Sequence, residues 1–174
     1  TAVYSGSKLP TPEVIALVEA RRRLFPRIYA ELFAAMEQCT LNAADAVARV
    51  EARLGEAGVP DDAAIAVLHV SAGNPFRRWP ADRFAALASA LTTLPQPMYV
   101  VVTSGPSESD AVDRVTSLAR ETPSIDASRI VHCGDFDLSE LAALVSRARL
   151  YVGGDSGPLH VAATTLTPVV ALFG

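Results

Sequence analysis

The side chains best placed to do chemistry lie near the end of the chain, in the stretch Gly153-Gly154-Asp155-Ser156-Gly157-Pro158-Leu159-His160. This stretch follows a short apolar run and opens a short helix, so N–H groups at the helix start can be aimed at an anion, most often a phosphate. We expect its first two glycines to allow a tight turn, Ser156 to cap the helix and Pro158 to occupy the first turn. An ordinary strand-to-helix turn is the alternative, but it gives no role to Asp155 or to His160, which can donate to a phosphate.

A second stretch, His69-Val-Ser-Ala-Gly-Asn-Pro-Phe-Arg-Arg-Trp-Pro80, also follows an apolar run and precedes a helix. It therefore lines the same edge of the predicted sheet. Ser71 and the amides around Gly73 can hold an anion, and Arg77 or Arg78 can neutralise it. Alternatively, the Trp-Pro pair begins the next helix and the arginines belong to a solvated loop. Because two such stretches occur, we favour the interpretation in which both face one diphosphate.

Two weaker candidates follow neighbouring strands. Ser107 or Glu108 can bond ribose hydroxyls or cap the next helix, and capping is the better interpretation when these residues are taken alone. Phe136 can stack on a base, although an aromatic residue there is more often packing, and His132 is interpreted as structural. The sequence contains no Ser-His-Asp set, no metal-binding spacing and no paired carboxylates with divided acid and base roles. We therefore expect neither a metal nor a cofactor.

These candidates need a sheet to position them, and from residue 63 the pattern alternates between strand and helix. The strands are expected at 64–69, 98–103, 129–132, 150–152 and 169–173, and the helices at 82–94, 107–121, 138–147 and 157–165. Continuous Val, Ile and Leu runs between helices of this length predict an α/β fold, a Rossmann-like parallel sheet with helices on both faces. Ligands of such sheets bind beyond the carboxyl ends of the strands.

The first third of the chain reads as helix from Thr11 to about Gly58. We expect three helices, with one division at Pro26 and another at about Asn42, and with Gly55 and Gly58 ending the last of them. The predicted organisation is therefore a helical N-terminal segment, 1–62, followed by a sheet domain, 63–174.

Length and composition limit the classes of function. With 174 residues, the chain is long enough for one well-buried domain and an appendage, and its 50% hydrophobic and 20% charged residues exclude disorder. A net charge of −4 argues against nucleic-acid binding. Cys39 and Cys133 form no metal or redox spacing, and we expect neither a membrane-spanning segment nor a signal peptide. We expect a cytosolic protein, and the start at Thr1 suggests a processed or excised piece.

Four pieces of the chain together match a known family in order and spacing. They are Arg77-Arg78-Trp79-Pro80 with Phe84, Leu138-Ser-Glu-Leu-Ala-Ala-Leu, Gly154-Asp-Ser-Gly-Pro-Leu-His160 and Pro168-Val-Val-Ala-Leu-Phe-Gly174. Over about residues 63–174 the sequence resembles the C-terminal half of the ADP-heptose:lipopolysaccharide heptosyltransferases, glycosyltransferase family 9. The piece ending at His160 is the most specific of the four.

The resemblance implies a GT-B architecture whose C-terminal domain holds a nucleotide-sugar donor. By position, the resemblance puts Ser71, Ala72 and Arg77 at the phosphates. It puts Ser107 or Glu108 at the ribose, Phe136 on adenine and Asp155 at the sugar. The diphosphate is expected at the helix start, on Ser156, Gly157, Pro158 and His160. It implies inverting, metal-independent transfer, in which the helix N-terminus, Arg77 and His160 stabilise the departing ADP. The expected partners are ADP-heptose and an acceptor glycan such as the lipopolysaccharide core. The expected location is the bacterial cytoplasm, with peripheral association of the whole enzyme at the inner membrane.

The chain also departs from the family pattern. The 11–58 segment does not resemble the family's N-terminal domain, which carries a Gly-rich turn and the carboxylate taken as general base. Val70-Ser71 replaces the usual Pro-Gly, and Arg77 stands at a Lys position. The family also normally continues beyond Gly174. We therefore expect a truncated donor-binding portion that contains no catalytic residue and transfers sugar weakly or not at all by itself.

Two other interpretations stay open at this point. One is a non-catalytic nucleotide-binding or scaffold module whose helical segment serves as a partner surface. The other is a different GT-B enzyme, such as a nucleotide-sugar epimerase, whose carboxylates and histidine would lie outside this sequence.

Overall fold

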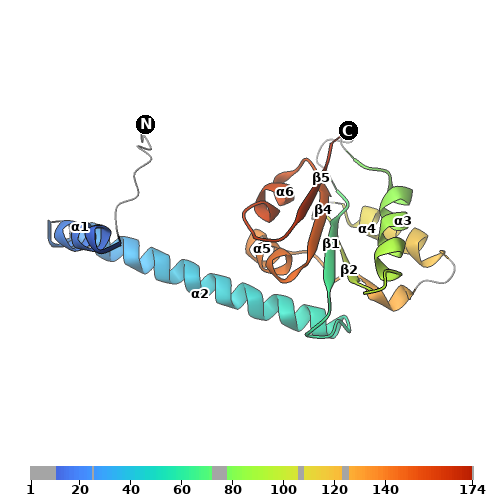
Figure 1. Cartoon of the computed structure of the whole chain (residues 1–174), viewed down its shortest axis with the longest axis horizontal. Helices are drawn as coiled ribbons and strands as arrows, with labels where there is room; N and C mark the ends of the chain where they lie inside the picture. The colour runs from blue at the N-terminus through green and yellow to red at the C-terminus, as the bar shows by residue number, and fades with distance from the viewer. Residues whose placement is uncertain (1–10, 25, 72–77, 106–107, 123–125, 174) are drawn as a thin grey trace. The chain divides into compact units, whose positions relative to one another are not determined.

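The computed structural model describes residues 11–24, 26–71, 78–105, 108–122 and 126–173, and these form two compact units, Thr1–Asn42 and Ala43–Gly174. Figure 1 labels the elements along the chain. In chain order they are α1 (Thr11–Leu24), α2 (Pro26–Glu56), β1 (Ile65–His69), α3 (Ala81–Thr92), β2 (Tyr99–Thr103), α4 (Ser109–Arg120), η2 (Ala127–Arg129), β3 (Ile130–Val131), α5 (Leu138–Arg147), β4 (Leu150–Gly154), α6 (Gly157–Ala162) and β5 (Val169–Leu172).

The helical segment contains two helices in place of the expected three. The division at Pro26 is confirmed, because proline fits the first turn of a helix and cannot continue the one before it. The second expected division, at about Asn42, is wrong. No proline or glycine stands between Pro26 and Gly55, and an asparagine inside a helix costs only a fraction of a kcal/mol, roughly 0.7. The two predicted helices are therefore one, α2.

The five strands form one parallel sheet in the order β3-β2-β1-β4-β5, which confirms the predicted fold class. The register aligns the carboxyl ends of the three central strands, because His69 of β1 pairs with Thr103 of β2 and with Gly153 of β4. Several elements are shorter than predicted, most visibly β3 and α6. Helix α6 ends at Ala162, and beyond it the hydroxyls of Thr164 and Thr165 donate to the backbone carbonyls three residues earlier.

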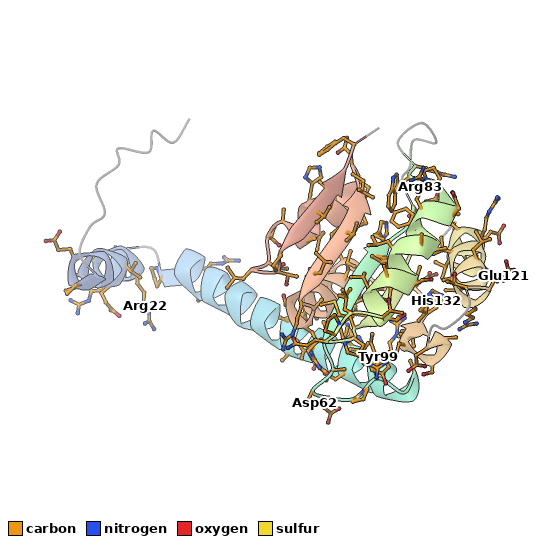
Figure 2. The ribbon with its side chains drawn as sticks, turned by 45° about the vertical axis from the view of Figure 1, so that its right-hand side comes forward. Arg22, Asp62, Arg83, Tyr99, Glu121 and His132 are labelled. Atoms are coloured by element: carbon orange, nitrogen blue, oxygen red, sulfur yellow. The ribbon has the colours of Figure 1, made fainter. Side chains whose placement is uncertain are left out.

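Helices cover both faces of the sheet, as predicted. Val67 of β1 belongs to a core cluster that it shares with α5 and α6, whereas Leu68 belongs to a cluster shared with α3 and α4. Figure 1 shows the same division, with α5 and α6 on one side of the strands and α3 and α4 on the other. Figure 2 draws the described side chains as sticks on the strands and helices of this unit.

The last turns of α2 are part of the sheet unit. Val50 and Leu54 are buried in the cluster that contains Val67. The division between the two compact units accordingly falls between Asn42 and Ala43, earlier than the boundary expected after residue 62. The physical reason is the apolar row on the last turns of α2, which covers a sheet face that would otherwise meet water.

A pair of valine substitutions tests this assignment. Val50 is buried and Val47, one turn away on the same helix, is 48% exposed. We expect Val50→Ala to lower the free energy of unfolding by about 1–3 kcal/mol, because it leaves a cavity under the sheet. Val47→Ala serves as the matched control, with a change within about 0.5 kcal/mol. Urea unfolding measures both, and equal effects would contradict the assignment.

Candidate functional site

A cavity of about 310 Å³ opens at the carboxyl ends of the central strands. It is built from the ends of β1 and β2, the segments that follow them, the segment before α5, and the start of α6. The lining residues are His69, Ser71, Thr103, Ser104, Gly105, Glu108, Phe136, Leu138, Leu141, Ser156, Gly157 and Pro158. Residues from the two stretches singled out in the sequence therefore meet at one cavity, at the edge of the sheet where a ligand was expected.

The predicted site residues divide into three groups. Those that line the cavity are Ser71, Glu108, Phe136, Ser156, Gly157 and Pro158. Asp155 and His160 do not line it: Asp155 is half-buried beyond β4, and His160 is exposed on α6. Ala72, Arg77 and Ser107 lie outside the residues that the structure describes.

The floor of the cavity is a buried chain of polar side chains. The N–H of Gly105 donates to Ser71 Oγ at 2.9 Å, and Ser71 Oγ lies 3.0 Å from His69 Nε2. The other ring nitrogen, His69 Nδ1, lies 3.1 Å from Thr103 Oγ1. These bonds join the residue that ends β1 to the residue that ends β2. Sequence reasoning gave neither His69 nor Thr103 a role, although polar residues that end two buried strands were a usable signal.

His69 acts in this chain as a neutral hydrogen-bonding group. Burial lowers its pKa to about 4, against a smaller opposing effect of the Glu108 carboxylate. A neutral imidazole has one N–H and one bare nitrogen, so one ring nitrogen donates and the other accepts. If Nε2 carries the hydrogen, Ser71 Oγ accepts from both His69 and Gly105, and its own O–H is left to donate into the cavity. The arrangement therefore suits an acceptor such as a phosphate oxygen.

Glu108 stands at the start of α4 without capping it. The residue is at the N-cap position, but its side chain makes no capping hydrogen bond, so the capping interpretation is wrong for Glu108. Its carboxylate forms an ion pair with Arg78. Arg78, from the second stretch, thus neutralises a carboxylate that lines the cavity.

The start of α6 differs from prediction in two details. Ser156 occupies the N-cap position, but its hydroxyl donates to the Gly154 carbonyl at 3.1 Å instead of capping the helix. Gly153 and Gly154 lie within β4, with no left-handed backbone, so the predicted tight turn is wrong. A Cβ on Gly153 would come within 2.8 Å of Tyr151 Oη, which explains this glycine by close packing. Pro158 lies in the first turn, as predicted.

Phe136 forms an aromatic side of the cavity and also packs against the core. One face of its ring carries the Arg53 guanidinium, whose central carbon is 4.0 Å from the ring centroid. Arg53 comes from α2, so sequence reasoning missed it: no local pattern connects residues that are 83 positions apart. His132, labelled in Figure 2, donates from Nδ1 to the Val102 carbonyl at 3.1 Å, in keeping with the structural interpretation.

The chemistry of the cavity is that of recognition. Hydroxyl groups and the start of α6 line the cavity, and the first N–H groups of a helix have no acceptor within the helix. Phe136, Leu138 and Leu141 add an apolar surface to the same lining. Among the residues that the structure describes, no group of three or more His, Cys, Asp or Glu side chains is gathered as a metal site would need. The cavity thus offers places for an anion and for a flat apolar group side by side.

Comparison with known proteins identifies the family. The sequence model of glycosyltransferase family 9 (heptosyltransferase) matches residues 16–174. The chain belongs to glycosyltransferase family 9. The match confirms the resemblance drawn from the motifs, and it extends into the helical segment that the motifs left out.

Individual relatives agree with this membership. Lipopolysaccharide heptosyltransferase 3 of Escherichia coli is 34% identical over 128 residues, which cover 72% of this chain and 35% of that protein. A solved glycosyltransferase of family 9 from Veillonella parvula superposes with a TM-score of 0.61 at 26% identity, covering 73% of this chain and 34% of that one. The E. coli ADP-heptose lipopolysaccharide heptosyltransferase II has the same fold, with a TM-score of 0.60 at 22% identity over 72% of this chain and 37% of that one. This family 9 chain spans about a third of the length of these relatives.

None of the helices in the described part of the chain combines the length and the apolar character needed to cross a membrane.

The buried His69 gives a prediction for pH dependence. Its pKa is about 4 in the folded chain and about 6.5 when unfolded, so between these values the unfolded state binds more protons. This contribution to stability is complete above pH 6.5 and is lost as the pH falls toward 4, by at most about 3 kcal/mol. NMR titration of the imidazole and urea unfolding at pH 7, 6 and 5 measure it.

A His69→Asn variant is expected to be less stable at pH 7 but to lose less stability on acidification. His160→Gln, which keeps His69, is the control and is expected to retain the wild-type loss. A His69 imidazole that titrates near pH 6.5 would contradict the neutral, buried role.

Proposed function

We propose that this chain forms the donor site of a family 9 glycosyltransferase that takes ADP-heptose and transfers the sugar, with inversion and without a metal, to the lipopolysaccharide core or another acceptor glycan. The observation that carries the proposal is the cavity at the carboxyl ends of β1 and β2 and the start of α6, whose lining combines hydrogen-bond donors with the ring of Phe136. The name of the E. coli ADP-heptose lipopolysaccharide heptosyltransferase II supports the choice of ADP-heptose, and the name of lipopolysaccharide heptosyltransferase 3 agrees with transfer of a heptose.

Each part of the donor has a matching part of the cavity. We assign the diphosphate to the Ser71 hydroxyl and the start of α6, because both offer hydrogen-bond donors to anionic oxygens. We assign the ribose hydroxyls to the carboxylate of Glu108, which is a strong hydrogen-bond acceptor, and the adenine to the ring of Phe136. The roles of Ala72 and Arg77 at the phosphates, Ser107 at the ribose, Asp155 at the sugar and His160 at the diphosphate stay predictions from the family resemblance.

The chemical contribution of such a site is to the leaving group. As the bond from the sugar to ADP breaks, negative charge develops on the diphosphate, and donors already fixed around it stabilise that charge without rearranging. The general base that activates the acceptor stays an expectation for a domain outside this sequence. The carboxylate of Glu108, paired with Arg78, is assigned to binding.

Calorimetric titration with ADP, UDP and GDP tests the proposal. We expect ADP to bind most tightly, and Ser71→Ala to weaken it about tenfold, because a hydrogen bond to a charged group is worth about 1.5–3 kcal/mol. Ser146→Ala, on the exposed side of α5 outside the cavity, is the matched control and is expected to leave affinity unchanged. Addition of EDTA is also expected to leave ADP binding unchanged.

The outcomes separate the proposals. Tighter binding of UDP or GDP would overturn adenine as the base, and no binding of any nucleotide would overturn the donor site and favour a scaffold role. Affinity that disappears with EDTA would overturn metal independence. Sugar transfer by the purified chain alone would overturn the expectation that the general base lies elsewhere.

A further inference from the structure

We propose that Arg53 is a positioning residue for the nucleobase: from α2 it fixes Phe136 as a preformed wall of the cavity and so raises affinity for the base. The inference rests on the proposed function, because it takes the flat apolar side of the cavity as the place of the base. It assigns a binding effect to helix α2, from which none of the described lining residues of the cavity comes.

The Arg53 guanidinium is hydrogen-bonded to the backbone of the segment that carries Phe136, residues 133–136. Its Nε donates to the Cys133 carbonyl at 2.8 Å and its Nη2 to the Asp135 carbonyl at 2.6 Å, and Nη2 also reaches the Cys133 carbonyl. Its Nη1 donates to Glu140 Oε2 at 3.2 Å. A planar guanidinium with five N–H donors can satisfy such divergent acceptors at once, which an ammonium group cannot do with the same geometry.

The backbone around Phe136 is shaped to this guanidinium. Gly134 has a φ of +78°, and a Cβ there would stand 3.1 Å from Arg53 Nη2, so both its conformation and its contact favour glycine. Immediately after Phe136, Asp137 and Glu140 form a reciprocal capping box that starts α5. The short segment is therefore fixed on one side by Arg53 and on the other by a helix start.

The ring of Phe136 contacts Arg53 and also lines the cavity. Arg53 covers one face at 4.0 Å, while the side chain contributes to the cavity beside Leu138 and Leu141. A ring already held in place loses little freedom when a base stacks on it, so more of the stacking free energy appears as affinity. Stacking of a base on an aromatic side chain is itself worth about 1–3 kcal/mol.

Arg49 provides a matched control one turn earlier on α2. It donates from Nε to Glu140 Oε1 at 2.8 Å and lies 3.6 Å from Asp137 Oδ2, so it shares the carboxylate partner of Arg53. No contact joins it to Phe136 or to the carbonyls of Cys133 and Asp135 among the described interactions. Loss of charge and of the bond to Glu140 is therefore common to Arg49→Met and Arg53→Met, whereas loss of support for Phe136 belongs to the second alone.

The experiment measures ADP and inorganic pyrophosphate binding to the full chain by calorimetry, with urea unfolding of every variant. We expect Arg53→Met to weaken ADP binding about fivefold and Phe136→Ala about tenfold or more, with pyrophosphate affinity unchanged in both. Arg49→Met is expected to change neither ligand. In a chain that already carries Phe136→Ala, Arg53→Met is expected to cause no further loss of ADP affinity.

A stability loss alone would not produce this pattern, because it would act on both ligands. Equal ADP affinity in wild type and Arg53→Met, or parallel losses for ADP and pyrophosphate, would overturn the inference and leave the proposed donor site standing. The same holds if Arg53→Met weakens ADP binding further in the Phe136→Ala chain. Wild-type chain that binds neither ADP nor pyrophosphate would overturn the proposed function, and the inference with it.

Discussion

The parallel register of three strands is the constraint on which the site depends. Because His69, Thr103 and Gly153 lie side by side in the sheet, the segments that follow β1, β2 and β4 leave from one edge. The same register brings the His69 ring between the hydroxyls of Thr103 and Ser71. A slip of one residue in either pairing would turn these side chains to the opposite face of the sheet. The fold and the polar floor of the cavity are consequences of one pattern of backbone hydrogen bonds.

Charged side chains near the cavity neutralise one another, whereas its hydrogen-bond donors are neutral. Glu108 is paired with Arg78, and Glu140 is paired with Arg49 and Arg53, so these two carboxylates have cationic partners. The hydrogen bond from Arg49 is the largest cause that lowers the pKa of Glu140. Burial meanwhile keeps His69 neutral. An anionic ligand would thus meet fixed dipoles and neutral donors, whose orientation costs nothing when the ligand arrives.

The parts that the sequence predicted are those set by local patterns. The strands that precede Ser71 and Ser156 are recognisable as short apolar runs, and a parallel sheet brings their ends together, so the cavity edge was predictable. The contact of Arg53 with Phe136 was not predictable, because no local pattern connects residues so far apart in the chain. The contact of His69 with Thr103 was missed, although both are polar residues that end buried strands. Gly153 was predicted as a turn residue. Glycine is needed there because a side chain would collide with Tyr151, and such a packing contact is visible only in the structure.

Helix α2 links stability and recognition through different faces. Val50 and Leu54, four residues apart, are buried on the sheet, while Arg49 and Arg53, one position earlier in each turn, face the segment that precedes α5. Two adjacent rows on one helix therefore carry two tasks. Changes in the apolar row should alter the free energy of unfolding, whereas loss of Arg53 from the basic row should alter the shape of the cavity wall. Burial of the apolar row anchors α2 on the sheet. An anchored helix can hold the Arg53 guanidinium in one place, and the guanidinium in turn fixes the ring of Phe136.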